Sequence, residues 1–200
     1  MITFSDLIDA GLNLGGYRTF NSLEERKTAF KKIAVDSGAL TLKDAEVLIR
    51  KGFLDSPAST KYHGSYWGGL FDHSYSVACT LRKLTKQLEL DWDDLLSPIR
   101  IGLLHDLCKM DQYLYDEEKK GFSYDKNTLL VGHGIKSVVI AQSLPDTKLT
   151  EEEIACITYH MGAFTEKEEW TSYTNAVHKY PNVLWTHTAD MLSSHVLELQ

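Results

Sequence analysis

The spacing of apolar residues is the feature that most restricts the fold of this chain. Apolar side chains recur three and four positions apart along almost its whole length, as in helices that bury one face. Ser22–Glu25 and Thr150–Glu153 have the sequence of a capping box, and Thr41–Asp44 repeats the pattern, so each is expected to begin a helix. No segment alternates convincingly between polar and apolar residues. We therefore predict a single all-α domain, a bundle of roughly six to eight helical segments.

Two segments interrupt this pattern. Residues 52–68 are rich in Gly and Ser and contain Pro57, which predicts an ordered loop. Residues 111–128 are polar and Tyr-rich, which predicts an irregular excursion or a short hairpin. The other helices are expected over residues 70–88, 93–109, 130–144, 150–160, 168–178 and 181–197. We expect residues 1–56 to form a helical extension packed on the core and residues 57–200 to form the main domain.

Composition excludes several classes of protein. The chain has 200 residues and a net charge of −7, which argues against a broad basic surface for duplex nucleic acid. No apolar run reaches the roughly 20 residues that a membrane-spanning helix needs, and residues 1–16 lack the basic cluster of a signal peptide. Cys79, Cys108 and Cys156 are widely separated and form no CxxC pair, which predicts reduced thiols and a cytoplasmic protein.

Histidines carry most of the functional information. Four of the eight fall inside expected helices beside apolar residues: His73, His105, His133 and His160. They follow one another at intervals of 27 to 32 residues, and Asp190 comes 30 residues after the last. Each interval matches one helix, a loop and a return, so antiparallel helices can bring these side chains to one level of a bundle. Imidazole and carboxylate groups bind Mn, Fe, Ni or Zn, and none of the cysteines is expected to join them.

A hydrogen-bonded position in the core is the alternative explanation for any one of these histidines. The acidic residues fit that explanation less well, because an ionised carboxylate is costly to bury unless it is paired or bound to metal. Asp106 lies in IGLLHDLC and Asp190 in VLWTHTADML. A salt bridge to Lys109, one turn later, would explain Asp106 without a metal ion. The residues alone leave a metal site and a structural core both open.

The ordered set resembles the HD-domain superfamily of metal-dependent phosphohydrolases, whose members are helical bundles. The family pattern is a His, a His-Asp doublet on a later helix, and a distant Asp. In this chain the matching residues are His73, His105, Asp106 and Asp190. The sequence HDLCK, which ends at Lys109, is similar to the frequent His-Asp-x-x-Lys form. The segment HGSYWGGLFDH, which begins at His63, is similar to the start of the HD domain in bacterial 3′–5′ exoribonucleases. By this resemblance residues 57–200 are an HD phosphohydrolase domain.

The resemblance implies a site with two divalent ions, whether Mn, Fe, Ni, Zn or Mg. The first ion would be held by His73, His105, Asp106 and Asp190, and the second by His133 and His160, with Asp106 between the two. A water molecule between the ions would attack phosphorus. Lys109 would grip a phosphate, or else be a solvated cation at a helix end. His63 would contact the substrate or protonate the leaving oxygen, or else be an ordinary surface histidine.

Two departures from the family pattern affect this assignment. The exoribonucleases carry a β-barrel before the HD domain, whereas residues 1–56 are too short and too helical to form one. Their second metal commonly takes a His-His pair, but here Met161 follows His160. A thioether is a poor ligand for a hard ion, so the second site would be open, weaker or completed by water. His187, one turn before Asp190, is expected to orient that carboxylate. His178 and His195 are assigned no role.

The predicted reaction is hydrolysis of a phosphoester or phosphoanhydride bond in a nucleotide or short oligonucleotide. The acidic composition and the missing barrel favour a small nucleotide, whereas the exoribonuclease resemblance favours a polynucleotide. The alternatives are a 3′–5′ exonuclease, a cyclic-nucleotide phosphodiesterase, a non-catalytic nucleotide-sensing module and a structural helical protein. Residues 111–128 are expected to form a wall or lid of the pocket. The aromatic residues available to stack on a base, or to pack at helix–loop junctions, are Trp67, Trp170, Tyr113, Tyr115 and Tyr124. Assembly into a homo-oligomer is left open.

Overall fold

The computed structural model describes residues 20–197, so the prediction about residues 1–16 lies outside the described part of the chain. The α-helices are α2 (Leu23–Phe30), α3 (Leu42–Arg50), α4 (Gly69–Leu88), α5 (Ser97–Leu104), α6 (His133–Gln142), α7 (Glu151–Thr158), α8 (Trp170–Lys179) and α9 (Asn182–Leu192). Short 3-10 or π-helical segments are η1 (Lys31–Asp36), η2 (Leu107–Asp111), η3 (Gly162–Phe164), η4 (Lys167–Glu169) and η5 (Ser193–Leu197). The strands β1 (Tyr113–Asp116) and β2 (Gly121–Tyr124) form an antiparallel hairpin. The all-α prediction is confirmed, with strand structure in the described residues confined to 111–128.

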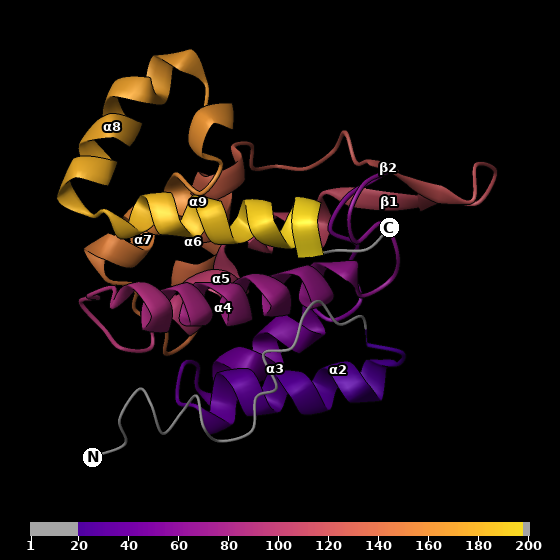
Figure 1. The fold of residues 1–200 in the computed structure, drawn as a ribbon. Coiled ribbons are helices and arrows are strands. Elements are labelled where there is room, and N and C mark those ends of the chain that lie inside the picture. Colours follow the sequence, from indigo (N-terminus) through magenta and orange to yellow (C-terminus); the bar gives the residue numbers. More distant parts are fainter. Residues whose placement is uncertain (1–19, 198–200) are drawn as a thin grey trace.

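Helix α4 is the centre of the bundle (Figure 1). It packs against α5 and α9, and α2 contacts it on the side away from α9. Helices α6 and α7 pack on each other, and α7 also contacts α9. The β1–β2 hairpin projects from one end of the bundle, while α8 lies at its outer edge. Within residues 20–197, every helix is too short or too polar to cross a membrane.

The N-terminal helices are joined to α4 by both apolar and ionic contacts. The rings of Phe30, Phe53 and Phe71 pack on one another with centroids 5.4 to 5.8 Å apart. Arg26 on α2 donates to the buried carboxylate of Asp72 on α4, with Nε 2.8 Å from Oδ1. A paired charge of this kind is tolerated in a protein interior because each ion satisfies the other. The division of the chain near residue 56 stays a prediction.

Two expected helices are shorter than their sequence pattern suggests. The helix predicted over 93–109 begins at Ser97, with Pro98 in its first turn, and ends at Leu104. Residues before it form a turn in which the Asp94 carboxylate accepts a hydrogen bond from the Leu96 amide at 2.8 Å. The helix predicted over 130–144 begins only at His133, because Gly132 has φ of +88° and interrupts regular helical geometry.

The three predicted helix starts differ in their hydrogen bonds. Thr150 and Glu153 form a complete capping box at α7. Ser22 caps α2, but the Glu25 carboxylate accepts from the amide of residue 21 instead of closing the box. Thr41 caps α3, while the buried carboxylate of Asp44 accepts from the backbone of residue 146 and the hydroxyl of residue 147. Asp44 therefore tethers α3 to the connection between α6 and α7.

We expect Thr150→Ala to lower the free energy of unfolding by about 1 kcal/mol. The Thr150 hydroxyl accepts from the Glu153 amide at 3.1 Å, and alanine removes this acceptor from the start of α7. Urea denaturation followed by circular dichroism measures the change, with exposed Thr171→Ala on α8 as the control. Equal stability of the two variants would contradict the prediction.

Candidate metal centre

His73 is placed by a tight turn ahead of α4. Gly68 has φ of +88° and precedes the helix, and a Cβ on Gly69 would lie 2.0 Å from the carbonyl oxygen of Gly64. Only glycine allows this approach, so the loop folds back against the first turn of α4. The turn brings the ring of His63 to 4.9 Å from that of His73, between centroids.

His105 and Asp106 point into the same site because α5 ends between them and η2. Consecutive side chains on a continuous α-helix diverge by about 100°. Here His105 is the last residue with helical geometry, and Asp106 has φ of −111° and ψ of +19°. The end of the helix thus turns both side chains toward α4 and α6, where the predicted continuous helix would have separated them.

His133 and His160 approach one another because α6 and α7 pack closely. A Cβ on Gly134 would lie 2.1 Å from the backbone oxygen of Thr158, so glycine is required where the helices cross. His133 is the first residue of α6, and His160 lies just beyond the end of α7. Their ring centroids are 5.1 Å apart.

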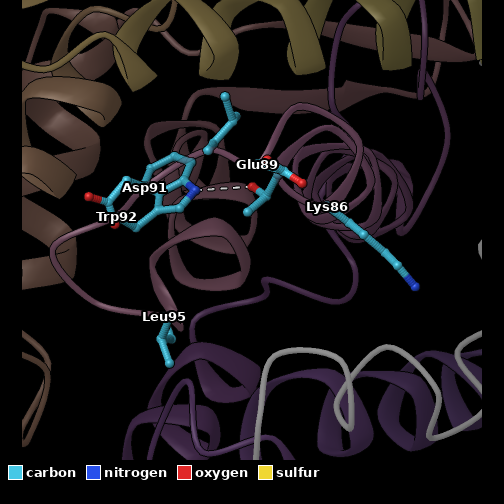
Figure 2. Close-up of a pocket in the computed structure, with 7 residues that line it drawn as sticks. Lys86, Glu89, Asp91, Trp92 and Leu95 are labelled. Carbon is cyan, nitrogen blue, oxygen red and sulfur yellow. Dashed lines mark hydrogen bonds between the residues drawn. The ribbon is translucent and has the colours of Figure 1, made fainter.

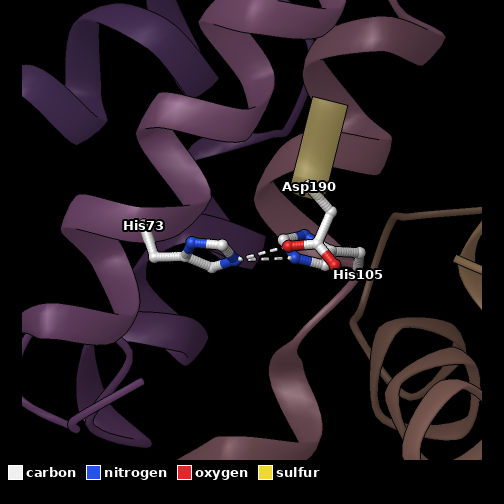
Figure 3. Close-up of side chains that lie close together, drawn as sticks. All are labelled: His73, His105 and Asp190. Carbon is white, nitrogen blue, oxygen red and sulfur yellow. Dashed lines mark hydrogen bonds and ion pairs between the residues drawn. The ribbon is translucent and has the colours of Figure 1, made fainter. Parts of the chain in front are cut away.

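Asp190 completes the cluster from α9. Its Oδ1 lies 3.1 Å from Nε2 of His73, which in turn lies 3.2 Å from Nε2 of His105. Figure 3 shows the imidazole of His73 directed at His105 and Asp190, although the three residues come from three different helical segments. The ligand atoms of these three side chains lie within 4.8 Å of one another, close enough to bind one ion.

The carboxylate of Asp106 divides the cluster into two groups. Its Oδ2 faces His73 at 3.5 Å and His105 at 3.4 Å. Its Oδ1 faces His133 at 2.7 Å and His160 at 3.6 Å. The structure therefore brings all six residues predicted as metal ligands together, with Asp106 between the two groups.

The donor set fits divalent cations. Nδ1 of His105 lies 2.9 Å from the carbonyl oxygen of Gly102, and Nδ1 of His160 lies 2.7 Å from that of Ile157. A carbonyl oxygen only accepts, so in the neutral imidazole each Nδ1 carries the hydrogen and each Nε2 presents a lone pair. Nε2 of His160 and Oδ1 of Asp106 are buried, and the 3.6 Å between them is too long for a hydrogen bond. A cation between these atoms would satisfy them, which a packed core does not.

The charges of the cluster are set by their neighbours. Burial raises the pKa of the Asp106 carboxyl, but Lys109, His105 and His133 outweigh burial and hold it well below its usual value. Burial likewise raises the pKa of Asp190, and His73, with His105 and His160, more than reverses this. Both carboxylates are consequently ionised at neutral pH, as metal ligands must be.

Lys109 and His63 each contact a candidate metal ligand: Lys109 contacts Asp106, and His63 lies beside His73. The Lys109 ammonium is 2.6 Å from Oδ2 of Asp106, which is the salt bridge that the sequence offered as an alternative. Burial, followed by His73 and Lys109, lowers the pKa of His63 to about 3, so this imidazole is uncharged at neutral pH. Direct contact of either residue with substrate stays a prediction. His195, which had been assigned no role, has its ring centroid 6.5 Å from that of His63.

Two further expectations need correction. Nδ1 of His187 lies 2.8 Å from the backbone oxygen of His160, so its hydrogen bond positions that turn instead of the Asp190 carboxylate. Cys108 was not expected near the cluster, yet its Sγ lies 3.5 Å from Nδ1 of His133. Burial raises the pKa of the Cys108 thiol to about 12, so it remains a neutral neighbour of the imidazole. Cys108 comes only two residues after Asp106, so the sequence already placed it close to the cluster. The end of α5 before η2 is what directs its side chain toward His133.

The cluster is open to solvent at His133 and Asp190. Their side chains are 28% and 13% exposed, whereas the other four candidate ligands are 2% exposed or less. A separate pocket of about 280 Å³ lies at the far end of α4, beside Trp92 and Thr85 (Figure 2). Twelve residues of helix separate Thr85 from His73, a distance of about 18 Å, and no histidine lines that pocket.

Comparison with known proteins gives one match. A family model described as the HD domain matches residues 70–190, which is more than half of the chain. The match begins at the start of α4 and ends at Asp190, so it spans all six candidate ligands. No curated protein and no solved structure matches the chain.

Proposed function

The chain belongs to the HD-domain family, whose members typically are metal-dependent phosphohydrolases, and we propose that it hydrolyses a phosphate ester or anhydride bond of a nucleotide or short oligonucleotide. The observation that carries this proposal is the position of Asp106. One of its carboxylate oxygens faces His73 and His105, and the other faces His133 and His160. A carboxylate shared between two groups of imidazoles is suited to two ions held side by side.

Each group of side chains has a defined part. His73, His105 and Asp190 would hold one ion, and His133 with His160 the other, with Asp106 contributing to both. Bound divalent ions supply positive charge for phosphoryl oxygens and lower the pKa of a water molecule. The backbone carbonyls of residues 102 and 157 orient two of the imidazoles, and Lys109 keeps Asp106 ionised. The neutral imidazole of His63 would donate a hydrogen bond to an oxygen of the substrate.

The openings of the cluster and its cations bear on how a phosphate would bind. The cluster is exposed to solvent at His133 and at Asp190. Lys109 and Lys136 are buried cations, but Lys109 pairs with Asp106 and Lys136 pairs with the exposed carboxylate of Asp111. The charges of both lysines are therefore balanced, and the bound ions would supply the positive charge that a phosphate requires.

Metal removal tests this function. The panel consists of nucleoside mono- and triphosphates, cyclic nucleotides and a short oligonucleotide. We expect the protein to turn over one of these classes, to lose that turnover after chelation and dialysis, and to regain it when Mn²⁺ is added. Product analysis by mass spectrometry identifies the bond that is cleaved. Turnover that survives complete metal removal would contradict the proposal, as would the absence of turnover in every class after reconstitution. In the latter case binding without turnover would favour the nucleotide-sensing alternative.

A further inference from the structure

The hairpin and the loop that carries His63 together form a cluster of three aromatic rings that has no part in the candidate metal centre. The ring centroid of Trp67 is 5.0 Å from that of Phe122 and 5.7 Å from that of Tyr115, which are themselves 5.3 Å apart. These rings do not form a closed core, because Trp67 is 59% exposed and Tyr115 is 37% exposed. Large aromatic side chains usually lose most of their exposed surface when their only role is packing.

The register of the hairpin places its aromatic residues on one face. Tyr113 pairs with Tyr124, and Tyr115 pairs with Phe122. Residues two apart on a strand share a face, so all four rings lie on the same side. Trp67 covers the outer pair from the loop before α4.

This aromatic face leads away from the metal centre. Strand β1 begins directly after η2, the segment that carries Lys109. Burial raises the pKa of the Tyr113 phenol and the Lys109 ammonium opposes this, so the inner tyrosine lies within reach of that charge. The outer pair is two residues further along the strand, roughly 7 Å beyond Tyr113.

The loop before α4 also links the two regions. His63 contacts His73 at the metal centre, and Trp67 is four residues later on the same loop. The close approach of Gly69 to Gly64 fixes the path of this loop. The position of Trp67 relative to the candidate ligands is therefore determined by backbone packing.

We propose that Trp67, supported by Tyr115 and Phe122, is a stacking surface for a nucleobase of the substrate whose phosphate lies at the metal centre. The inference rests on the proposed function and specifies its substrate class as base-containing. Stacking on an aromatic ring is tolerant of sequence because every base has a π face. The site is therefore expected to accept all four common bases with modest preferences.

The test uses nucleosides, which have no phosphate and so bind independently of hydrolysis. Ligand-detected NMR titrations with adenosine, guanosine, cytidine, uridine and ribose measure each dissociation constant. We expect the wild-type protein to bind the nucleosides more tightly than ribose, and Trp67→Leu to weaken nucleoside binding about tenfold or more. Trp67→Phe retains a π face and should restore most of the affinity. Trp170, the other indole that the sequence offered for stacking, lies on α8, far from the β1–β2 hairpin (Figure 1). Trp170→Leu therefore removes a comparably exposed indole and is the matched control, which should bind as the wild type does.

Two results would overturn the inference: nucleosides that bind no better than ribose, or Trp67→Leu that binds them as the wild type does. If Trp67→Leu fails to fold, Tyr115→Leu on the hairpin side gives the same test. If the protein turns over a nucleotide, Trp67→Leu should raise the KM for that nucleotide and leave its kcat unchanged. The KM for ribose 5-phosphate, which has no base, should not change. The two proposals can fail separately. If the protein hydrolyses no phosphate ester but still binds nucleosides through Trp67, the proposed function is wrong and the stacking surface is supported.

Discussion

Asp106→Asn is expected to reduce turnover of the substrate by roughly a thousandfold or more and to remove most of the bound metal. Asparagine keeps the shape of the side chain but removes its negative charge. In the structure this charge faces four imidazoles and the Lys109 ammonium, all within 3.6 Å of one of its oxygens. The amide nitrogen would also direct hydrogens toward imidazole lone pairs or the ammonium, so the substitution affects both groups of ligands.

The matched control is Asp111→Asn, which changes a carboxylate on the adjacent η2 segment. Asp111 is largely exposed and pairs with Lys136, so this variant should retain metal and most of its turnover. Metal content is measured by mass spectrometry of the purified protein, and circular dichroism establishes that each variant is folded. A folded Asp106→Asn protein with wild-type metal content and turnover would refute the role of Asp106.

Gly102→Ala should have the largest effect on stability, a loss of about 3 kcal/mol in the free energy of unfolding. A Cβ at residue 102 would lie 2.3 Å from Cα and 2.5 Å from the backbone nitrogen of Ala78. Backbone atoms cannot rotate away as a long side chain can, so α4 and α5 must separate. Because these helices carry His73 and His105, their separation should also weaken metal binding.

Gly121→Ala on β2 is the control for the general cost of adding a methyl group. Its Cβ would meet its nearest neighbour, the oxygen of Lys119, at 3.8 Å, an ordinary contact. Its effect on the free energy of unfolding should stay within about 0.5 kcal/mol. Thermal and urea unfolding of both variants measure the difference. If Gly102→Ala is as stable as Gly121→Ala, the close approach of α5 to the backbone of α4 at Ala78 is contradicted.

The sequence predicted the helical class and the members of the candidate site because both follow from local patterns. Apolar periodicity marked α4 and α7 within one or two residues, and the intervals between histidines matched antiparallel packing. It did not predict the break between α5 and η2. Leu-Leu-His-Asp-Leu-Cys has the apolar spacing of a continuous helix, and the break depends on packing against residues distant in the chain.

The errors in the surroundings of the site have the same cause. His187 and Asp190 are one helical turn apart, which suggested a contact between them, but Gly162 brings the turn after α7 under the His187 ring. A Cβ on Gly162 would lie 2.6 Å from that ring. Because Gly162 is far from His187 in the sequence, local spacing could not predict this contact. The ion pair of Lys109 with Asp106 was foreseeable from their spacing, whereas the contact of Cys108 with His133 was not.

The distribution of the candidate ligands over α4, the α5–η2 junction, α6, the end of α7, and α9 has a consequence for how the protein is made. During synthesis the first five candidate ligands leave the ribosome before α9, which carries Asp190. The complete cluster can form only when α9 docks on α4, so tight ion capture waits for this docking step. An ion bound there would stabilise the fully folded chain relative to every partly folded one. The stabilising free energy would grow with the logarithm of the free ion concentration. Cellular metal supply would then influence how much of this protein survives proteolysis after synthesis.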